Sequence, residues 1–177
     1  MYQKNNFSDK YIVEILRIIT RNAIIVHNND TRSVVYMTET IFSKIIAGDI
    51  PSFKVYEDDY VYAFLDISQV TKGHTLLVPK KVSANIFETD EETMKHIGAA
   101  LPKVANAIKS AFNPDGLNII QNNGEFADQS VFHLHFHLLP RYENDTDGFG
   151  YKWETHEDII DDAQKETIAK QIAAQFE

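Results

Sequence analysis

Three histidines, His133, His135 and His137, occupy alternate positions in the apolar segment 131–140. In a β-strand, alternate side chains point to opposite faces, so the three imidazoles would line one face. The other face would carry Phe132, Leu134, Phe136 and Leu138. A strand with one apolar face is anchored in a core and holds the side chains of its other face rigidly. Three groups that titrate near neutral pH, held in a row, therefore indicate a site for chemistry.

The composition predicts one ordinary domain and excludes several classes of function. The chain has 177 residues, 44% of them apolar, which is enough for a packed core. Its net charge of −9 argues against binding of nucleic-acid polymers, although such a protein can still hold a small anion on backbone N–H groups and imidazoles. The absence of cysteine excludes disulfides and thiolate metal sites and fits a reducing cytoplasm.

The sequence contains no clear membrane span or signal peptide. Its most apolar stretch, 11–26, is interrupted by Glu14, Arg17 and Arg21. We therefore expect a soluble, cytoplasmic protein without a membrane partner.

The first 36 residues differ from the rest of the chain. They carry five basic and three acidic residues, whereas the whole chain is acidic. The pattern predicts a helix over 9–20 with Ser8 or Asp9 as its cap, and a loop at 28–31. We predict that 1–36 form an N-terminal appendage to a domain at 37–177.

The remaining pattern predicts an α+β fold. Apolar spacing predicts a short helix from 41 that ends at Gly48, and a capping box at 89–92 opens a long helix that runs to 112. Strands are expected at 54–58, 60–66, 74–78, 117–121 and in the histidine segment, and a C-terminal helix at 162–176. These elements make a mainly antiparallel five-stranded sheet with a long helix and a C-terminal helix packed on it.

The histidine row has three interpretations. It can be an exposed strand face without function. It can bind a metal: neighbouring histidines lie about 6.5–7 Å apart along a strand, but the outer pair lies about 13 Å apart, and no nearby carboxylate completes a ligand set. It can also act on phosphorus, because a neutral imidazole is a good nucleophile at pH 7 and its neighbours can donate to phosphoryl oxygens. The adjacent loop 122–130 offers further donors, and no other phosphate-binding motif competes.

Four motifs occur in order along the chain. They are IFSKIIAGDIP at 41–51, AFLDIS at 63–68, GHTLLVPK at 73–80 and QSVFHLHFHLL at 129–139. Together they resemble the histidine triad family of nucleotide hydrolases and transferases, in its bacterial form, from about Thr40 to Trp153 and on toward the end of the chain. The resemblance implies hydrolysis at the α-phosphate of nucleoside phosphoramidates or dinucleoside polyphosphates, with a purine nucleotide as substrate. It leaves open a nucleotidyl transferase or phosphorylase, or a non-catalytic nucleotide-binding adaptor.

The resemblance also implies roles for the catalytic side chains. His135 would attack the α-phosphorus and carry the nucleotide covalently. His137 would contact the phosphate oxygens and assist the leaving group, and His133 and His74 would form a relay that orients the nucleophile. Without the resemblance, His74 also reads as a buried polar residue at a strand start.

Substrate-binding residues follow from the same resemblance. Asp66 would accept both ribose hydroxyls, Gln129 and Ser130 would bind the phosphate or leaving group, and Asn122 would contact the substrate nearby. The base pocket would be walled by Ile41, Phe42, Ile45, Phe64 and Ile67. Each of these residues also has a purely structural interpretation. The five apolar residues can be core residues, Asp66 can be a turn residue, and Asn122 can cap the loop.

The chain departs from the family pattern at two places. The residues at the positions of a structural zinc site in some bacterial members are Thr40, Ser43 and Val82, so we expect no zinc there and no cofactor. Asp128 stands where many members have glycine, which makes its amide a doubtful phosphate donor. The resemblance further implies a homodimer that pairs through the long helix and the fourth strand.

Overall fold

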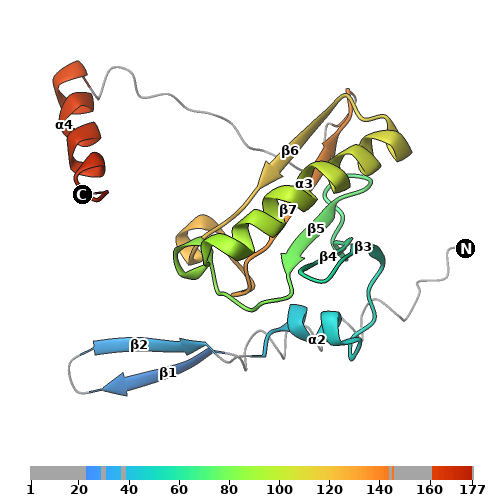
Figure 1. The fold of residues 1–177 in the computed structure, drawn as a ribbon, viewed down its shortest axis with the longest axis horizontal. Helices are drawn as coiled ribbons and strands as arrows, with labels where there is room; N and C mark the ends of the chain where they lie inside the picture. The colour runs from blue at the N-terminus through green and yellow to red at the C-terminus, as the bar shows by residue number, and fades with distance from the viewer. Residues whose placement is uncertain (1–22, 29–30, 37–38, 144, 146–160, 177) are drawn as a thin grey trace, which may run out of the picture.

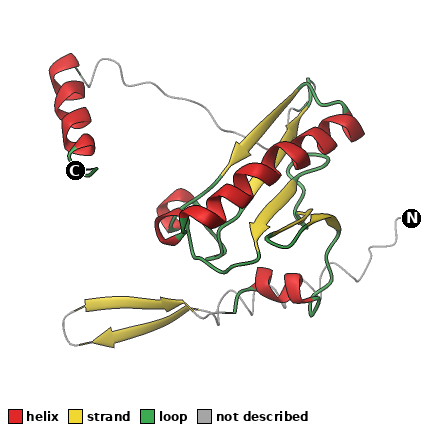
Figure 2. Ribbon diagram, viewed as in Figure 1, coloured by secondary structure: helices red, strands yellow, loops and turns green. Residues whose placement is uncertain are grey.

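The computed structural model describes residues 23–28, 31–36, 39–143, 145 and 161–176. Its centre is a five-stranded sheet in the order β3-β4-β5-β7-β6, with every neighbouring pair antiparallel (Figures 1 and 2). The strands are β3 (Lys54–Glu57), β4 (Val61–Leu65), β5 (Thr75–Pro79), β6 (Gly116–Ile120) and β7 (Phe136–Arg141). The predicted α+β fold with a five-stranded antiparallel sheet is confirmed.

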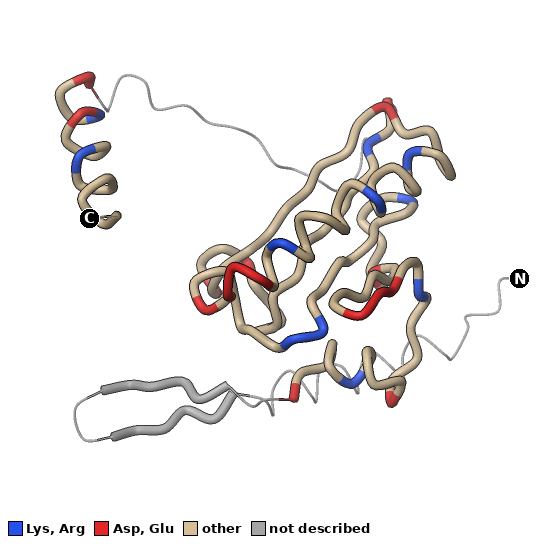
Figure 3. Tube along the Cα trace, in the orientation of Figure 1, with Lys and Arg blue, Asp and Glu red and all other residues tan. Residues whose placement is uncertain are grey.

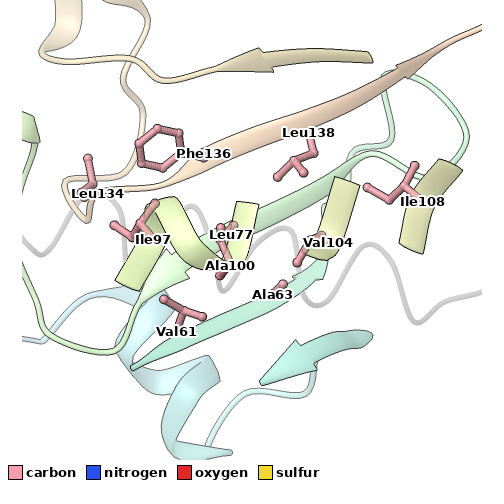
Figure 4. Packing of buried hydrophobic residues seen from close by; sticks show 10 residues of the cluster. All are labelled: Val61, Ala63, Leu77, Ile97, Ala100, Val104, Ile108, Leu134, Phe136 and Leu138. Carbon is pink, nitrogen blue, oxygen red and sulfur yellow. The ribbon is translucent and has the colours of Figure 1, made fainter. Parts of the chain in front are cut away.

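Apolar clusters cover both faces of β4 and β5, so these two strands are nearly continuous runs of buried residues. On one face Val61, Ala63 and Leu77 pack against α3 (Glu91–Phe112). Figure 4 shows this cluster, in which Ile97, Ala100, Val104 and Ile108 of α3 meet the strands. On the other face α2 (Ile41–Ala47) packs against Tyr62, Phe64, Leu76 and Val78.

The ends of α2 and α3 are capped by side chains. At α2 a capping box joins Thr40 and Ser43, and Gly48 ends the helix with a φ of 86°. At α3 the expected capping box at 89–92 is wrong by one residue: Asp90 is the N-cap and accepts from the Thr93 amide. Thr89 instead closes the short 3-10 helix η1 (Ile86–Glu88), where its hydroxyl donates to the Asn85 carbonyl.

Charged residues gather where β5 ends (Figure 3). Lys80 contacts Glu57 at 2.8 Å, and Lys81 contacts Asp90 at 2.7 Å. These pairs link the end of β5 to β3 and to the start of α3. The acidic side chains at the start of α3 interact favourably with the positive end of the helix dipole. Each exposed pair contributes little to stability by itself.

The chain outside this core contributes three elements. β1 (Ala23–Asn28) and β2 (Thr31–Tyr36) form an antiparallel pair that the sequence analysis did not predict, although both segments are rich in β-branched residues. The helix expected at 9–20 lies outside the described residues, and the appendage at 1–36 stays a prediction. α4 (Asp162–Ala173) confirms the C-terminal helix, but its described side chains are exposed rather than packed on the sheet. Among the described residues, no helix has the length and apolar composition needed to cross a bilayer.

Truncation of Ile97 to alanine tests the role of the α3 face. Ile97 is fully buried, so Ile97→Ala should lower the free energy of unfolding by about 2–5 kcal/mol in urea titrations. The matched control is Ile168→Ala in α4, where the side chain is 43% exposed and the change should stay within about 0.5 kcal/mol. Equal effects at the two positions would contradict this packing.

Candidate active site

The histidine row lies mostly before strand β7 rather than within it. β7 begins at Phe136, so the expectation of one strand over 131–140 is wrong and only His137 belongs to the strand. The pairing of β5 with β7 stops at Leu77 and Phe136, and the Leu134 amide instead donates to the Ser83 carbonyl at 2.8 Å. Near this point β5 ends at Pro79, which has no N–H to extend a ladder.

The alternation of side chains persists without the strand. Leu134, Phe136 and Leu138 belong to the cluster beneath α3 (Figure 4). The histidines occupy the opposite side, where the Phe42 ring from α2 packs edge-on against His133 and His135, with centroids 5.8 and 5.2 Å apart. The imidazoles therefore sit between the sheet and α2, away from the α3 core.

His133 is fully buried and held from both ring nitrogens. Its Nε2 lies 2.9 Å from the Pro79 carbonyl, which can only accept, so Nε2 carries the proton. Its Nδ1, 2.7 Å from the Thr40 hydroxyl, is then the acceptor. Burial is the largest effect and lowers the pKa of His133 to about 4, against the opposing effect of the Pro79 hydrogen bond. This ring is a neutral structural support at pH 7.

His135 has its tautomer set by the backbone of His133. Nδ1 of His135 lies 2.7 Å from the His133 carbonyl oxygen, so Nδ1 donates its proton and Nε2 carries the free lone pair. Burial lowers the pKa of His135, although the hydrogen bond to His133 and the charge of Asp66 partly oppose it. The ring is thus neutral, oriented and unprotonated at Nε2, which are the requirements for a nucleophile.

His137 and His74 form a second pair beside His135. His74 Nε2 lies 2.9 Å from His137 Nδ1, and the rings of His135 and His137 meet edge-on with centroids 4.9 Å apart. Burial, followed by the charges of His135 and His74, lowers the pKa of His137 to about 4. Burial also lowers the pKa of His74, although Asp66 and the Ser68 backbone oppose the change. His74 thus contacts His137, whereas His133 orients His135.

Asp66 lies at the end of β4, at the edge of this pair. Its Oδ1 accepts from the Ser68 amide at 2.7 Å, and its Oδ2 lies 3.6 Å from His74 Nε2. Gln69, which the sequence analysis missed, connects the two ends of this loop. Its Nε2 donates to the carbonyls of Asp66 and His74, and its Oε1 accepts from the Gly73 amide. Only the tertiary contacts reveal this role, because a glutamine in a loop has no sequence signature.

The loop before the histidines is organised by Gln129. The Gln129 side chain is buried and donates to the carbonyls of Ala84 and Val131, while its Oε1 accepts from the Gly124 amide. These contacts use the amide to shape the loop, so substrate binding through Gln129 would require breaking them. Ser130 is exposed and free to face a ligand.

Asn122 and Asp128 meet across the same loop. The Asn122 side chain lies 3.5 Å from the Asp128 carbonyl, a contact at the limit of hydrogen bonding. Asp128 has a φ of 59°, which explains why the position favours glycine and tolerates aspartate. Its amide donates to the Glu125 carbonyl at 3.0 Å, which agrees with the doubt about it as a phosphate donor.

The five residues expected to wall a base pocket fall into two groups. Ile41, Phe42 and Phe64 are buried in the cluster beneath α2, and Ile45 packs against it. Ile67 is 55% exposed beside Asp66. The Phe42 ring belongs to the core group and also contacts His135.

The site also brings together groups that can bind a metal. Within the described part of the chain, Asp66, His74 and His137 form the one cluster with ligand atoms close enough to share an ion. The sequence analysis found no carboxylate for such a set, since Asp66 is distant from the histidine row along the chain. At the positions of the family's zinc site, the Thr40 and Ser43 hydroxyls are occupied by the α2 capping box.

The buried neutral histidines predict a loss of stability in mild acid. An imidazole with a lowered pKa in the folded state binds fewer protons than its unfolded form, so its contribution is complete above about pH 6.5 and is lost as the pH falls toward about 4. For His133 the loss is about 3 kcal/mol.

Urea unfolding between pH 7.5 and about 5 measures the larger part of this loss, at pH values above the usual pKa of Asp and Glu. A free energy of unfolding that stays constant over this window would show that the imidazoles are not buried in neutral form.

Comparisons with known proteins agree with this geometry. The HIT domain model matches residues 47–144. The protein Hit of Bacillus subtilis is 56% identical over 133 residues, which cover 75% of this chain and 91% of that protein. The adenosine 5′-monophosphoramidase HNT1 of Saccharomyces cerevisiae is 40% identical over 133 residues, which cover 73% and 81%.

The same likeness holds in three dimensions. The crystal structure of a HIT family member from Bacillus subtilis superposes with a TM-score of 0.74 at 55% identity, covering 76% of this chain and 95% of that one. The resemblance inferred from the four motifs is confirmed: this chain belongs to the HIT domain (histidine triad) family.

Proposed function

We propose that this protein hydrolyses nucleoside phosphoramidates or dinucleoside polyphosphates at the α-phosphate through a nucleotidyl-histidine on His135. The observation that carries the proposal is the 2.7 Å contact between His135 Nδ1 and the His133 carbonyl, which leaves Nε2 as the free nucleophile. The names of two yeast relatives, both adenosine 5′-monophosphoramidases at 40% identity, support this substrate class and favour a purine.

The first step forms a bond from His135 Nε2 to the α-phosphorus and breaks the bond to the leaving group. An amine leaving group takes up one proton from solvent as it departs, because His137 is neutral at pH 7 and carries no extra proton to give. His137 lies beside His135, where it can relay that proton and donate a hydrogen bond to the phosphoryl oxygens. In the second step water attacks the phosphorus and loses one proton to solvent, the nucleoside monophosphate is released, and the free imidazole is restored. His135 and His137 need no prior deprotonation at pH 7, because burial lowers the pKa of both imidazoles.

Recognition of the nucleoside falls to the loop that contains Asp66. One carboxylate oxygen is held by the Ser68 amide, and the side chain remains partly exposed, with oxygens available to accept ribose hydroxyls. Exposed Ile67 offers an apolar contact for the base, while the Phe42 ring packs edge-on against His135. Ser130 is available to the phosphate or leaving group.

Trapping the covalent intermediate tests the proposal. After rapid mixing with adenosine 5′-phosphoramidate and acid quench, intact-mass spectrometry should show one adenylyl adduct, located on His135 by peptide mapping. His135→Ala should abolish the adduct and lower kcat by a factor of about 10³ or more, as expected for removal of a nucleophile. His96→Ala, a surface histidine paired with Glu92, is the control and should turn over normally.

The same experiment separates the rival functions. Release of adenosine diphosphate in phosphate buffer would identify a phosphorylase, and binding without adduct or turnover would identify an adaptor. Equal rates for wild type and His135→Ala would end the claim of histidine nucleophilic catalysis.

We further propose a homodimer formed through β6. This strand is one edge of the sheet, so its outer backbone groups can pair with a second copy about a two-fold axis. Its Ile119 lies opposite Leu138, on the face that α3 covers elsewhere, yet is 47% exposed. A second chain would cover that side chain.

Light scattering after size exclusion measures the dimer directly. Wild type should have about twice the chain mass of 20.3 kDa, and Ile119→Lys should shift it to the monomer. The matched control is Val55→Lys on β3, the opposite edge, where the side chain is 40% exposed. A wild-type monomer, or a dimer that Val55→Lys disrupts and Ile119→Lys does not, would place the interface elsewhere or exclude it.

A further inference from the structure

Asp66, His74 and His137 come from three places in the chain and meet at one point. Asp66 follows β4, His74 precedes β5, and His137 lies in β7. One ligand atom from each lies within 4.8 Å of the other two. His74 is buried and the other two are half-buried, so the cluster is anchored in the fold yet reachable from solvent.

The spacing of these atoms is close to one face of a tetrahedral metal site. Two ligands at about 2.0–2.1 Å from a tetrahedral zinc lie about 3.3 Å apart. Two separations in the cluster fall on either side of that value: His74 Nε2 lies 2.9 Å from His137 Nδ1 and 3.6 Å from Asp66 Oδ2. Small movements of the side chains would therefore bring all three ligands onto one ion.

Contacts with neighbouring groups hold the ligands in place. The Val70 amide lies 3.4 Å from Nδ1 of His74, and Nε2 of the same ring faces His137, so this ring is held at both nitrogens. Ser68 holds Asp66 through its amide, and Gln69 joins the backbones of both ligands.

We infer that Asp66, His74 and His137 form a binding site for a divalent transition metal ion of the zinc class, and that the bound ion inhibits the enzyme. Two imidazoles and one carboxylate suit zinc, whereas magnesium and calcium require oxygen ligands. Three protein ligands leave the fourth position to water.

We expect inhibition because the ion binds residues that the nucleotide also needs, and this expectation rests on the proposed function. Asp66 is the group assigned to the ribose hydroxyls, and His137 is assigned to the phosphoryl oxygens. A metal ion held by both removes them from the nucleotide, so metal and nucleotide compete for the same enzyme form. His135 is outside the ligand set and keeps its hydrogen bond to His133.

Metal binding is tested on the full chain without reference to turnover. Cobalt(II) serves as the spectroscopic probe after removal of metals with a chelator. One equivalent should give the visible absorption of a tetrahedral nitrogen–oxygen site, and zinc(II) should displace it. Asp66→Asn and His137→Asn should each weaken binding by about tenfold or more, while His96→Ala, which lies outside the cluster and is paired with Glu92, should bind as wild type does. No tetrahedral spectrum, or equal affinity in Asp66→Asn, would overturn the site.

Turnover tests inhibition. Zinc(II) should raise the apparent KM for adenosine 5′-phosphoramidate with kcat unchanged, and a chelator should reverse the effect. Adenosine monophosphate should lower the affinity for cobalt(II). Activation by zinc, or inhibition that persists in Asp66→Asn, would refute this mode of action. If the protein proves inactive, the cobalt spectrum and its competition by the nucleotide still decide the metal site.

Discussion

The hydrogen bond from His135 to the carbonyl of His133 is the contact on which the site depends. It sets one ring tautomer, aims one lone pair and requires the backbone at His133 to stay in place. That backbone is held because the His133 ring is itself fixed between the Pro79 carbonyl and the Thr40 hydroxyl. His135, the proposed nucleophile, is thus positioned by a neighbour two residues away, whose own ring is fully buried.

Thr40 links this support to the helix that covers it. The same hydroxyl accepts from the Ser43 amide as the N-cap of α2 and contacts His133, so formation of α2 and orientation of the histidines are coupled. Phe42, two residues into the helix region, then packs against the rings of His133 and His135. A short helix that would be marginal alone is stabilised by these contacts.

Burial gives the site its electrostatic character. Surrounding apolar groups disfavour the imidazolium form, which lowers the pKa of all four histidines. Asp66 is the one carboxylate among the contacts that oppose this effect at His74 and His135. The cluster therefore keeps neutral, nitrogen-rich groups beside a single anion, a combination suited both to phosphorus chemistry and to a transition metal.

Local sequence determined which faces are apolar, that α2 ends at Gly48 and which histidines share a side. Alternation in 133–138 and the helical spacing of α3 follow from the periods of the two backbone geometries, so they could be read directly. The family and the fold followed from the four motifs. The start of β7 at Phe136 could not be predicted from the sequence, because it depends on where its partner strand β5 ends. Only the folded chain placed Asp66 beside His74, used Gln129 and Gln69 to shape loops, and left Ile67 exposed while it buried Ile41. These outcomes depend on contacts between segments distant in the sequence, and a periodic pattern records no information about such contacts.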